Sequence, residues 1–586
     1  MSKELKTLLP LVRKHWWRYA LGLVFLVGID YAQTEIPQFI KRIVDSIATL
    51  EAGGNALLFP ILFTMVLTAF FIASGRFLWR FFIHGASRRI ERDFRGKLFS
   101  HLMTLPMKSF QETPVGELMA RATNDMQSIR MLTGMAIVTF IDGFFMSSLV
   151  LFRMFRENAG IALKVIIPLP IITVIILFFG ASIGKRFKKI QEVYGSMSTL
   201  VQETLQGIRI VKAFVKEETF AERFNLDNDR YRKANMSLVM IFGFFFPLIN
   251  FIAGITMLIL LLSGGQSILE GKMSPGTLTA MIAYIEMLLW PMIGAGFTVN
   301  MIQRGTASLK RINEVLFTKA EEKTKNGIVP IKMPESGDFS FNSLSFSYPG
   351  SEQKALKDIS FAIPWGSTLG ILGRIGSGKS TLLKLMTRIL EPEQNMIMFG
   401  GVDITAIDVR ELRSLYGYVP QESFLFSDSI KNNILFANPD LSEESLERLL
   451  TIAALENDLS LFPEGINTVV GEKGLTLSGG QKQRVSIARA LAVNPGVLVF
   501  DDSLSAVDTE TEEKILQALI RERKGRTNII VSNRVSTLQN ADAIAVFDSG
   551  ALIQFGKPGE LIATEGFYAK IAAMQRLSHQ SGQVQA

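Results

Sequence analysis

Two different patterns of hydrophobic residues divide the chain near residue 320. Before that point, apolar stretches of about 20 residues recur, which is the length that crosses a bilayer as an α-helix. From residue 339 onward, short apolar runs alternate with segments of helical periodicity, which is typical of a largely parallel α/β sheet. The sequence therefore predicts a helical transmembrane domain at 1–320, a charged linker at 321–338, an α/β domain at 339–578 and a tail at 579–586.

The transmembrane domain is predicted to contain six spans, and the loops between them differ in charge. The loops after the second and fourth spans are long and rich in Lys and Arg, so they and the N-terminus are predicted to be cytoplasmic. The loops after the third and fifth spans are short and poor in positive charge, so they face outward. This pattern predicts a multi-pass protein of the cytoplasmic membrane, surrounded by lipid, with spans at 17–40, 57–82, 132–153, 160–181, 238–263 and 275–299.

Both long cytoplasmic loops carry amphipathic helical patterns, so the flanking spans are predicted to continue beyond the membrane. Pro114 and Gly116 interrupt the first pattern, and residues 214–219 interrupt the second. A short transverse helix is expected at each tip, and a plain solvated helical hairpin is the alternative.

Composition and charge exclude several classes of protein. A chain of 586 residues with 48% hydrophobic residues is too long for one core and too apolar for a purely soluble enzyme. The net charge of +8 resides in the basic loops, so it indicates membrane topology and not nucleic-acid binding. The chain has no cysteine, which excludes disulfides and thiol chemistry, and its first residues lack the pattern of a cleavable leader.

Three acidic residues, Asp30, Asp142 and Glu286, lie well inside predicted spans. Charge at that depth is costly, so each is expected to face a cavity or a partner and not lipid. Binding of a small-molecule substrate and hydrogen bonding between helices explain these carboxylates about equally well. Trp290 and the phenylalanines at 244–246 are candidates to line the same cavity, although such side chains more often pack or face lipid.

A glycine-rich loop between a predicted strand at 369–372 and a predicted helix at 381–389 is typical of phosphate binding. Its residues fit the P-loop spacing G-x-x-x-x-G-K-[ST], in which bare backbone N–H groups surround nucleotide phosphates and the lysine reaches the β and γ groups. The hydroxyl after the lysine is a candidate ligand for Mg²⁺. The nucleotide-binding candidates are Gly373, Gly376, Ser377, Gly378, Lys379, Ser380 and Thr381.

Two further stretches fit a nucleotide-hydrolysing domain. The apolar strand at 496–500 ends in Asp501, which places a carboxylate at a strand end where it can hold Mg²⁺ through water. Between the P-loop and this strand lies the sequence LSGGQ, followed by a helical pattern. Its serine and the backbone N–H groups at the helix start form a candidate anion site, made by Ser478, Gly479, Gly480 and Gln481.

With LSGGQ at this distance from a P-loop, nearly the whole chain resembles a type IV (exporter-fold) ABC half-transporter. The resemblance implies ATP and Mg²⁺ as ligands, adenine stacking on Tyr348, and a Q-loop glutamine, Gln421, that touches Mg²⁺ and senses the membrane domain. It also implies an X-loop at Gly471, Glu472 and Gly474, and a D-loop at Ser505, Ala506 and Asp508. In this family two nucleotide domains close head to tail, so each ATP lies between the P-loop of one and the LSGGQ of the other.

Two positions depart from the pattern of the family. The residue after the Mg²⁺-binding aspartate is normally a glutamate that orients the attacking water, but here it is Asp502. Aspartate is one methylene shorter, and a misplacement near 1 Å costs on the order of a hundredfold in rate. The switch histidine is replaced by Asn533, which can hydrogen-bond a γ-phosphate but cannot carry a proton. Natural or engineered, both departures weaken the site that contains this chain's own P-loop.

The sequence therefore predicts an ATP-driven exporter of amphipathic small molecules, drugs or lipids, in which this chain is the degenerate-site subunit of a heterodimer. Its partner is expected to be a second half-transporter with an intact catalytic glutamate and switch histidine, served by this chain's LSGGQ. The alternative within transport is a homodimeric lipid flippase or drug exporter. A soluble ABC ATPase of DNA repair or translation conflicts with the spans, and a nucleotide-gated channel or regulatory receptor would tolerate slow hydrolysis.

Overall fold

The computed structural model describes residues 5–48, 55–324, 331–348, 350–471 and 477–583. The chain divides into two compact units, each of which is described separately. The first unit comprises residues 1–105 and 113–319, and the second comprises residues 106–112 and 320–586. The division near residue 320 separates the apolar part of the sequence from the part in which strands and helices alternate.

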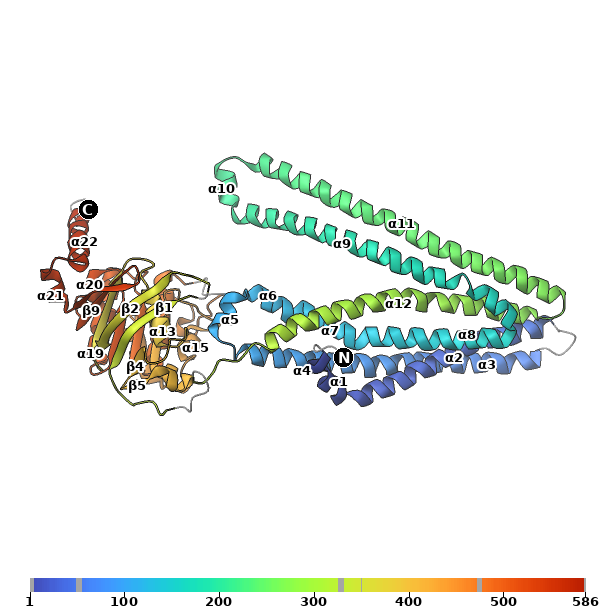
Figure 1. Ribbon diagram of the computed structural model, residues 1–586, viewed down its shortest axis with the longest axis horizontal. Helices are drawn as coiled ribbons and strands as arrows, with labels where there is room; N and C mark the ends of the chain where they lie inside the picture. Colours follow the sequence, from blue (N-terminus) through green and yellow to red (C-terminus); the bar gives the residue numbers. More distant parts are fainter. Residues whose placement is uncertain (1–4, 49–54, 325–330, 349, 472–476, 584–586) are drawn as a thin grey trace. The chain divides into compact units, whose positions relative to one another are not determined.

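Long helices build the first unit (Figure 1). Helices α2, α3, α8 and α12 form a bundle, while α9 and α11 pair with each other and are joined through α10. The bounds are α1 (Leu5–Lys14), α2 (Trp16–Ala48), α3 (Asn55–Trp79), η1 (Arg80–His84), α4 (Gly85–Leu102), α6 (Val115–Ala120), η2 (Arg121–Asp125), α7 (Met126–Met131), η3 (Leu132–Ala136), α8 (Ile137–Ile166), α9 (Leu169–Gln206), α10 (Ile208–Ala213), α11 (Glu217–Leu269) and α12 (Pro275–Leu316).

Four helical stretches among the described residues are long and apolar enough to cross a membrane: Leu58–Leu102, Val115–Ile166, Glu217–Leu269 and Pro275–Leu316. They contain four of the six predicted spans, so the full set of six is not confirmed. The predicted span at 17–40 lies in α2, where Asp30, Gln33 and Glu35 reduce the apolar character. The predicted span at 160–181 is divided between α8 and α9 at Pro168.

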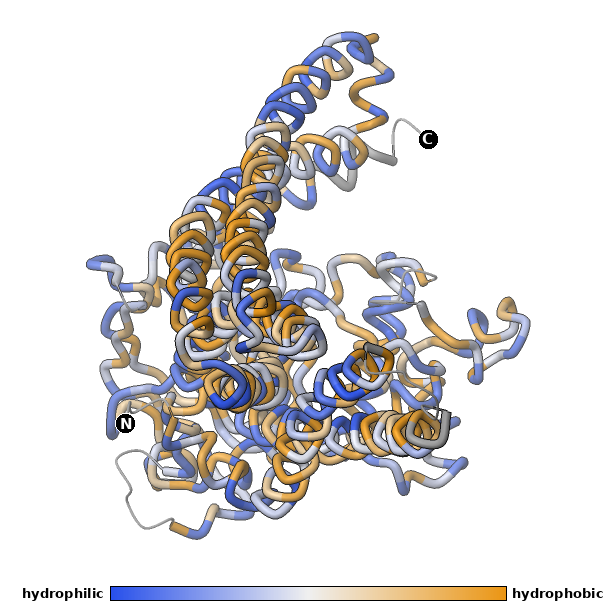
Figure 2. Tube along the Cα trace, turned by 90° about the vertical axis from the view of Figure 1, so that its right-hand side faces the viewer, coloured by the Kyte–Doolittle hydropathy of each residue, from blue (hydrophilic) through white to orange (hydrophobic). Residues whose placement is uncertain are grey.

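The paired helices α9 and α11 change character along their length. Figure 2 shows hydrophobic residues on both helices near the bundle and hydrophilic residues toward α10. Within the apolar part, Phe179 of α9 packs on Phe245 of α11, with ring centroids 5.6 Å apart. The apolar parts are thus suited to lipid or to a protein partner, and the polar parts to water.

The tip of each long loop carries a short helix before a predicted break, although Gly116, the other predicted break of the first loop, lies inside α6. Helix α5 (Met107–Glu112) ends before Pro114, and α10 ends before Val215, which has a φ of +50°. Helix α5 belongs to the second unit, although it lies in sequence between two helices of the first.

Two sheets form the framework of the second unit. The six-stranded sheet has the order β10-β9-β3-β8-β7-β6, and all its pairs are parallel except β10 with β9, which confirms the largely parallel sheet. The four-stranded sheet, β2-β1-β4-β5, is antiparallel. The bounds are β1 (Phe339–Ser347), β2 (Lys354–Ile363), β3 (Thr368–Gly373), β4 (Ile397–Phe399), β5 (Val402–Asp403), β6 (Tyr416–Val419), β7 (Val497–Asp501), β8 (Thr527–Val531), β9 (Ala543–Asp548) and β10 (Ala551–Gly556).

Helices connect the strands, and the C-terminal ends of the parallel strands meet at one edge of the sheet, where ligands bind in open α/β sheets. The helix bounds are α13 (Lys379–Met386), η5 (Ile404–Ala406), α14 (Val409–Ser414), α15 (Ile430–Leu435), α16 (Glu443–Ile452), α17 (Glu456–Leu459), η6 (Gly465–Asn467), α18 (Gly479–Ala492), α19 (Thr509–Glu522), α20 (Val535–Leu538), α21 (Pro558–Ala563) and α22 (Phe567–Gln583). The helix predicted to reach residue 389 ends at Met386, because Arg388 adopts a φ of +49°.

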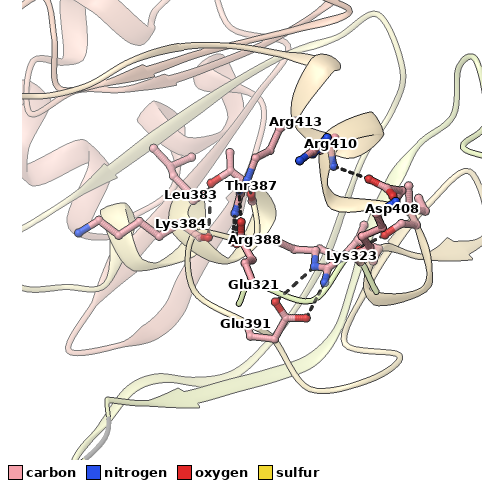
Figure 3. Close-up of polar contacts among 12 residues, drawn as sticks. Glu321, Lys323, Leu383, Lys384, Thr387, Arg388, Glu391, Asp408, Arg410 and Arg413 are labelled. Carbon is pink, nitrogen blue, oxygen red and sulfur yellow. Dashed lines mark hydrogen bonds and ion pairs between the residues drawn. The ribbon is translucent and has the colours of Figure 1, made fainter. Parts of the chain in front are cut away.

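The first residues of the predicted linker form hydrogen bonds with other parts of the second unit (Figure 3). Arg413 donates to both carboxylate oxygens of Glu321, at 3.0 and 2.7 Å. The carbonyl oxygen of Lys323 accepts from the Val409 N–H at 2.9 Å and from the buried Arg388 at 3.4 Å. The chain is therefore ordered immediately after residue 320, and α14 supplies most of the contacts.

Replacing Arg413 by alanine is expected to lower the free energy of unfolding of the second unit by about 1–3 kcal/mol, because charge-assisted, bidentate hydrogen bonds are lost. The Thr387 and Arg388 carbonyls lose a donor as well. The control is Arg410→Ala, since Arg410 is exposed on the same helix. Thermal unfolding of the full chain measures both variants. Equal shifts in Tm would contradict the stabilising role of the Arg413 hydrogen bonds.

Candidate functional site

The glycine-rich loop joins the end of β3 to the start of α13. Gly376 and Gly378 have φ angles of +81° and +100°, in a region that favours glycine. A Cβ atom added at Gly373 would lie 2.3 Å from the Phe547 carbonyl oxygen, whereas the space beside Gly376 is open. The loop therefore presents bare backbone next to open space, at the N-terminus of a helix.

Two polar side chains of this loop are positioned for an anion. Lys379 Nζ donates to the carbonyl oxygens of Gly373 and Arg374, at 2.7 and 2.8 Å, and burial lowers the pKa of this lysine. Ser377 is 1% exposed, and its Oγ has no hydrogen-bond partner among the described residues. A phosphate group would satisfy both side chains and the backbone N–H groups, so the loop fits the triphosphate of a nucleotide.

The candidate Mg²⁺ ligands lie beside this loop. Ser380 Oγ donates to Asp501 Oδ1 at 2.8 Å, which brings together two oxygen ligands of the kind that Mg²⁺ prefers. Tyr418 OH donates to the other oxygen, Oδ2, at 2.9 Å. Burial raises the pKa of Tyr418, which keeps its hydroxyl protonated as a donor. The sequence analysis missed Tyr418, because only the pairing of β6 with β7 brings it to Asp501.

The two residues that depart from the family pattern, Asp502 and Asn533, lie together at the same edge of the sheet. Asp502 follows β7 with a φ of +51° and donates its backbone N–H to the Val531 carbonyl at 3.1 Å. Asn533 Nδ2 donates to Asp502 Oδ2 at 3.4 Å. Burial raises the pKa of Asp502, and Lys379 lowers it. Both departures therefore belong to the site of the P-loop lysine.

The remaining nucleotide-site candidates are placed as follows. The hydroxyl groups of Tyr348 and Thr381 are 3.1 Å apart, so Tyr348 lies next to the P-loop helix. Gln421 is exposed two residues after the end of β6. Gly471 of the expected X-loop is described, whereas Glu472 and Gly474 lie outside the described residues.

The LSGGQ residues form the start of α18, with Ser478 as its N-cap. Ser478 Oγ accepts from the Gln481 N–H at 3.3 Å, and Gln481 Oε1 accepts from the Ser478 N–H at 2.9 Å, so the two form a capping box. Gln481 Nε2 donates to Asp458 Oδ1 at 2.9 Å. A Cβ atom on Gly480 would lie 2.9 Å from the Ala506 carbonyl oxygen. These contacts hold the start of α18 in place, and its N-terminus is the second candidate anion site.

The D-loop is held from two sides by residues that the sequence analysis did not identify. Gln483 of α18 accepts from the Ala506 N–H at 3.2 Å. Arg534, which follows Asn533, donates to the Ser505 carbonyl at 3.2 Å. Asp508 caps α19 by accepting from the Thr511 N–H at 2.9 Å. The D-loop thus contacts α18, the helix that begins in LSGGQ, and Arg534, the residue after the switch position Asn533.

A cavity of about 310 Å³ lies within the bundle of the first unit. Asp30 and Asp142 both line it, as the sequence analysis expected for a cavity, but Glu286 is exposed on α12 and is not among its lining residues. Trp290 lines it, whereas the phenylalanines at 244–246 do not. The sequence analysis missed the basic and amide side chains of this cavity, which are Gln33, Arg76 and Arg80.

Known protein families match the sequences of both units. Residues 19–292 match the family described as "ABC transporter transmembrane region", and residues 356–505 match "ABC transporter". A solved structure, "Structure of a bacterial Atm1-family ABC exporter with ATP bound", superposes with a TM-score of 0.81 at 25% identity, covering 96% of this chain and 99% of that one.

Full-length relatives give the same result. The chain is 37% identical to the "Probable multidrug resistance ABC transporter ATP-binding/permease protein YheI" of Bacillus subtilis, over 98% of each protein. It is 34% identical to the "Multidrug resistance-like ATP-binding protein MdlA" of Escherichia coli, over 96% of this chain and 95% of that protein. It is 30% identical to the "ATP-dependent lipid A-core flippase" of Vibrio vulnificus, over 98% of each. The chain therefore belongs to the ABC transporters of the Atm1-like exporter fold, in which ATP hydrolysis drives transport.

Proposed function

We propose that this chain exports amphipathic small molecules, drugs or lipids, across the cytoplasmic membrane as one half of a heterodimer. In this proposal α2 and the segment at 160–181 supply the two remaining spans, and ATP binds with Mg²⁺ at Lys379, Ser380 and Asp501. Relatives named for multidrug resistance and for lipid A-core flipping support amphipathic cargo.

The observation that carries the heterodimer is the pairing of Asp502 with Asn533. The carboxylate that follows Asp501 is one methylene shorter than glutamate, and its neighbour across the site is an amide donor 3.4 Å away. An amide side chain does not act as an acid or a base near neutral pH, and a shortened carboxylate is misplaced for orienting water. The P-loop and the Ser380–Asp501 pair keep the features of an ATP site, so this site is suited to binding ATP and poorly suited to hydrolysis.

The signature residues of the same chain are intact and well supported by the capping box at Ser478. Because the family resemblance implies that LSGGQ completes the site of the other chain, these residues serve a partner with an intact glutamate and histidine. The second candidate is a homodimeric flippase or drug exporter, which the 30% identity to a lipid A-core flippase favours.

ATP hydrolysis by the full chain purified alone separates the two candidates. The heterodimer proposal predicts turnover near background, at least about tenfold below that of the chain co-purified with its partner from native membranes, because both sites of a self-pair would contain Asp502 and Asn533. Brisk, drug- or lipid-stimulated turnover of the chain alone would overturn the heterodimer and support the homodimer.

A further inference from the structure

The cavity in the bundle of the first unit is lined by both acidic and basic side chains, which differ in burial. Asp30 of α2 is 0% exposed, while Arg76 and Arg80, from the α3–η1 junction, are exposed. Trp79 and Trp290 also line the cavity. The volume of about 310 Å³ lies at the lower end of the range for small-molecule sites, about 300–1,000 Å³. It is large enough for the head group of an amphiphile.

Asp30 has no nitrogen donor among the described residues. Its buried oxygens have no partner within hydrogen-bond distance in the described part of the chain, and the group that interacts with it is the carboxyl of Asp142, which lies near the positive charge of Arg76. Two adjacent buried carboxyl groups avoid repulsion by keeping one proton between them. An ammonium group that donates to Asp30 can replace that proton, so Asp30 is the polar group of this cavity that a ligand can satisfy.

The chemistry of that ligand follows from what Asp30 lacks. An oxygen of a carboxylate needs an N–H or O–H donor, and at membrane depth a positive charge on the donor adds to the attraction. A protonated primary, secondary or tertiary amine supplies both. A quaternary ammonium group carries the same charge but has no N–H, so it can use the tryptophan rings and leaves the oxygens of Asp30 unsatisfied.

We propose that the Asp30 cavity selects amphiphiles that carry an N–H-bearing ammonium head group and discriminates against quaternary ammonium groups of equal charge. This proposal rests on the proposed export of amphipathic molecules and names the substrate class of that function. The ammonium group donates to Asp30, and the rings of Trp79 and Trp290 contact the apolar part of the ligand next to it. Arg76 balances the charge of Asp142.

The test is calorimetric titration of the full chain in lipid nanodiscs, with protein-free nanodiscs as the blank. The probes are dodecylamine, dodecyldimethylamine and dodecyltrimethylammonium, which have the same alkyl chain and differ in N–H donors and size. At about pH 9, where both amines still carry their proton and the carboxyl pair gives up its own more readily, the amines are expected to bind about tenfold or more tightly than the quaternary compound, because a hydrogen bond to a charged group is lost with the latter. If the dimethylamine bound as weakly as the quaternary compound, size and not the N–H would decide, and the proposal would be wrong.

The Asp30→Asn variant should abolish the preference for the amines, because it lowers the affinity for both amines by more than the affinity for the quaternary compound. The control is Glu286→Gln, which removes a carboxylate of the same domain outside this cavity and should keep the preference for amines. Binding of ATP to each variant confirms folding, and Asp30→Ser, which also removes the carboxylate, replaces Asp30→Asn if the latter does not fold. Loss of the preference in Glu286→Gln would refute the proposal, whereas failure of ATP-driven transport with the preference intact would refute only the proposed function.

Discussion

Replacing Ser478 by alanine is expected to lower ATP hydrolysis by the proposed heterodimer by about a hundredfold or more, since removing one donor to the charge of a transition state costs that much. The residue lies far in sequence from this chain's P-loop, and its contacts are with Gln481 of α18. In the proposed arrangement its hydroxyl and the N-terminus of α18 face the ATP held by the partner. Loss of Ser478 should therefore disable the competent site, although the residue belongs to the degenerate subunit.

A matched control separates this effect from the loss of a helix cap. Ser442 caps α16 by accepting from the Ser445 N–H at 3.3 Å, in the same way that Ser478 caps α18. Each Ser→Ala change should cost about 1 kcal/mol of stability as a lost N-cap. Only Ser478→Ala should also lower the ATPase rate of the co-purified complex. If both variants, with matched Tm values, hydrolysed ATP at the wild-type rate, the role of LSGGQ proposed here would be wrong.

Local signals in the sequence identified the residues of the candidate nucleotide site. The P-loop, the carboxylate at the end of β7 and the cap of α18 each consist of residues close together in the chain, so spacing alone identifies them. The structure adds the hydrogen bonds from Lys379 Nζ to the Gly373 carbonyl and from Ser380 to Asp501. The assignment of each residue to a role in catalysis stays a prediction.

Contacts between distant segments could not be predicted in this way. Tyr418 reaches Asp501 only through strand pairing, and Arg534 reaches the Ser505 carbonyl only because β8 and the D-loop lie at one edge. The two arginines that line the cavity, Arg76 and Arg80, were also missed, since hydropathy places them simply at the end of an apolar segment. Which residues share a cavity depends on how the helices pack, and the sequence pattern does not show this packing.

The span prediction shows a different limit. Apolar length identified four candidate spans among the described residues, but α2 is polar enough at Asp30, Gln33 and Glu35 to fail the same measure. Those polar residues lie in the bundle, where Asp30 and Gln33 line the cavity. A helix that lines a polar cavity is expected to be less apolar than one that faces lipid. The weak hydropathy of α2 is therefore consistent with its place at the cavity.

The second prediction of large effect follows from the proposed degenerate site and concerns where hydrolysis occurs. The Asp502→Asn change should alter the ATPase rate of the co-purified complex by less than about twofold, because the shortened carboxylate contributes little to water activation. Replacing the catalytic glutamate of the partner by glutamine should lower the rate by about a hundredfold or more. An equal loss in both variants would assign hydrolysis to both sites.

Vanadate trapping in the complex co-purified with this chain tests that claim most directly. Vanadate takes the place of the released phosphate, so it holds ADP only in a site that has hydrolysed ATP. A photo-reactive, radioactive ATP analogue should label both chains in the cold, before turnover, because Lys379 and the surrounding P-loop bind nucleotide. After turnover with vanadate, the label should be trapped on the partner and remain near background on this chain. Equal trapping on both chains would contradict the account.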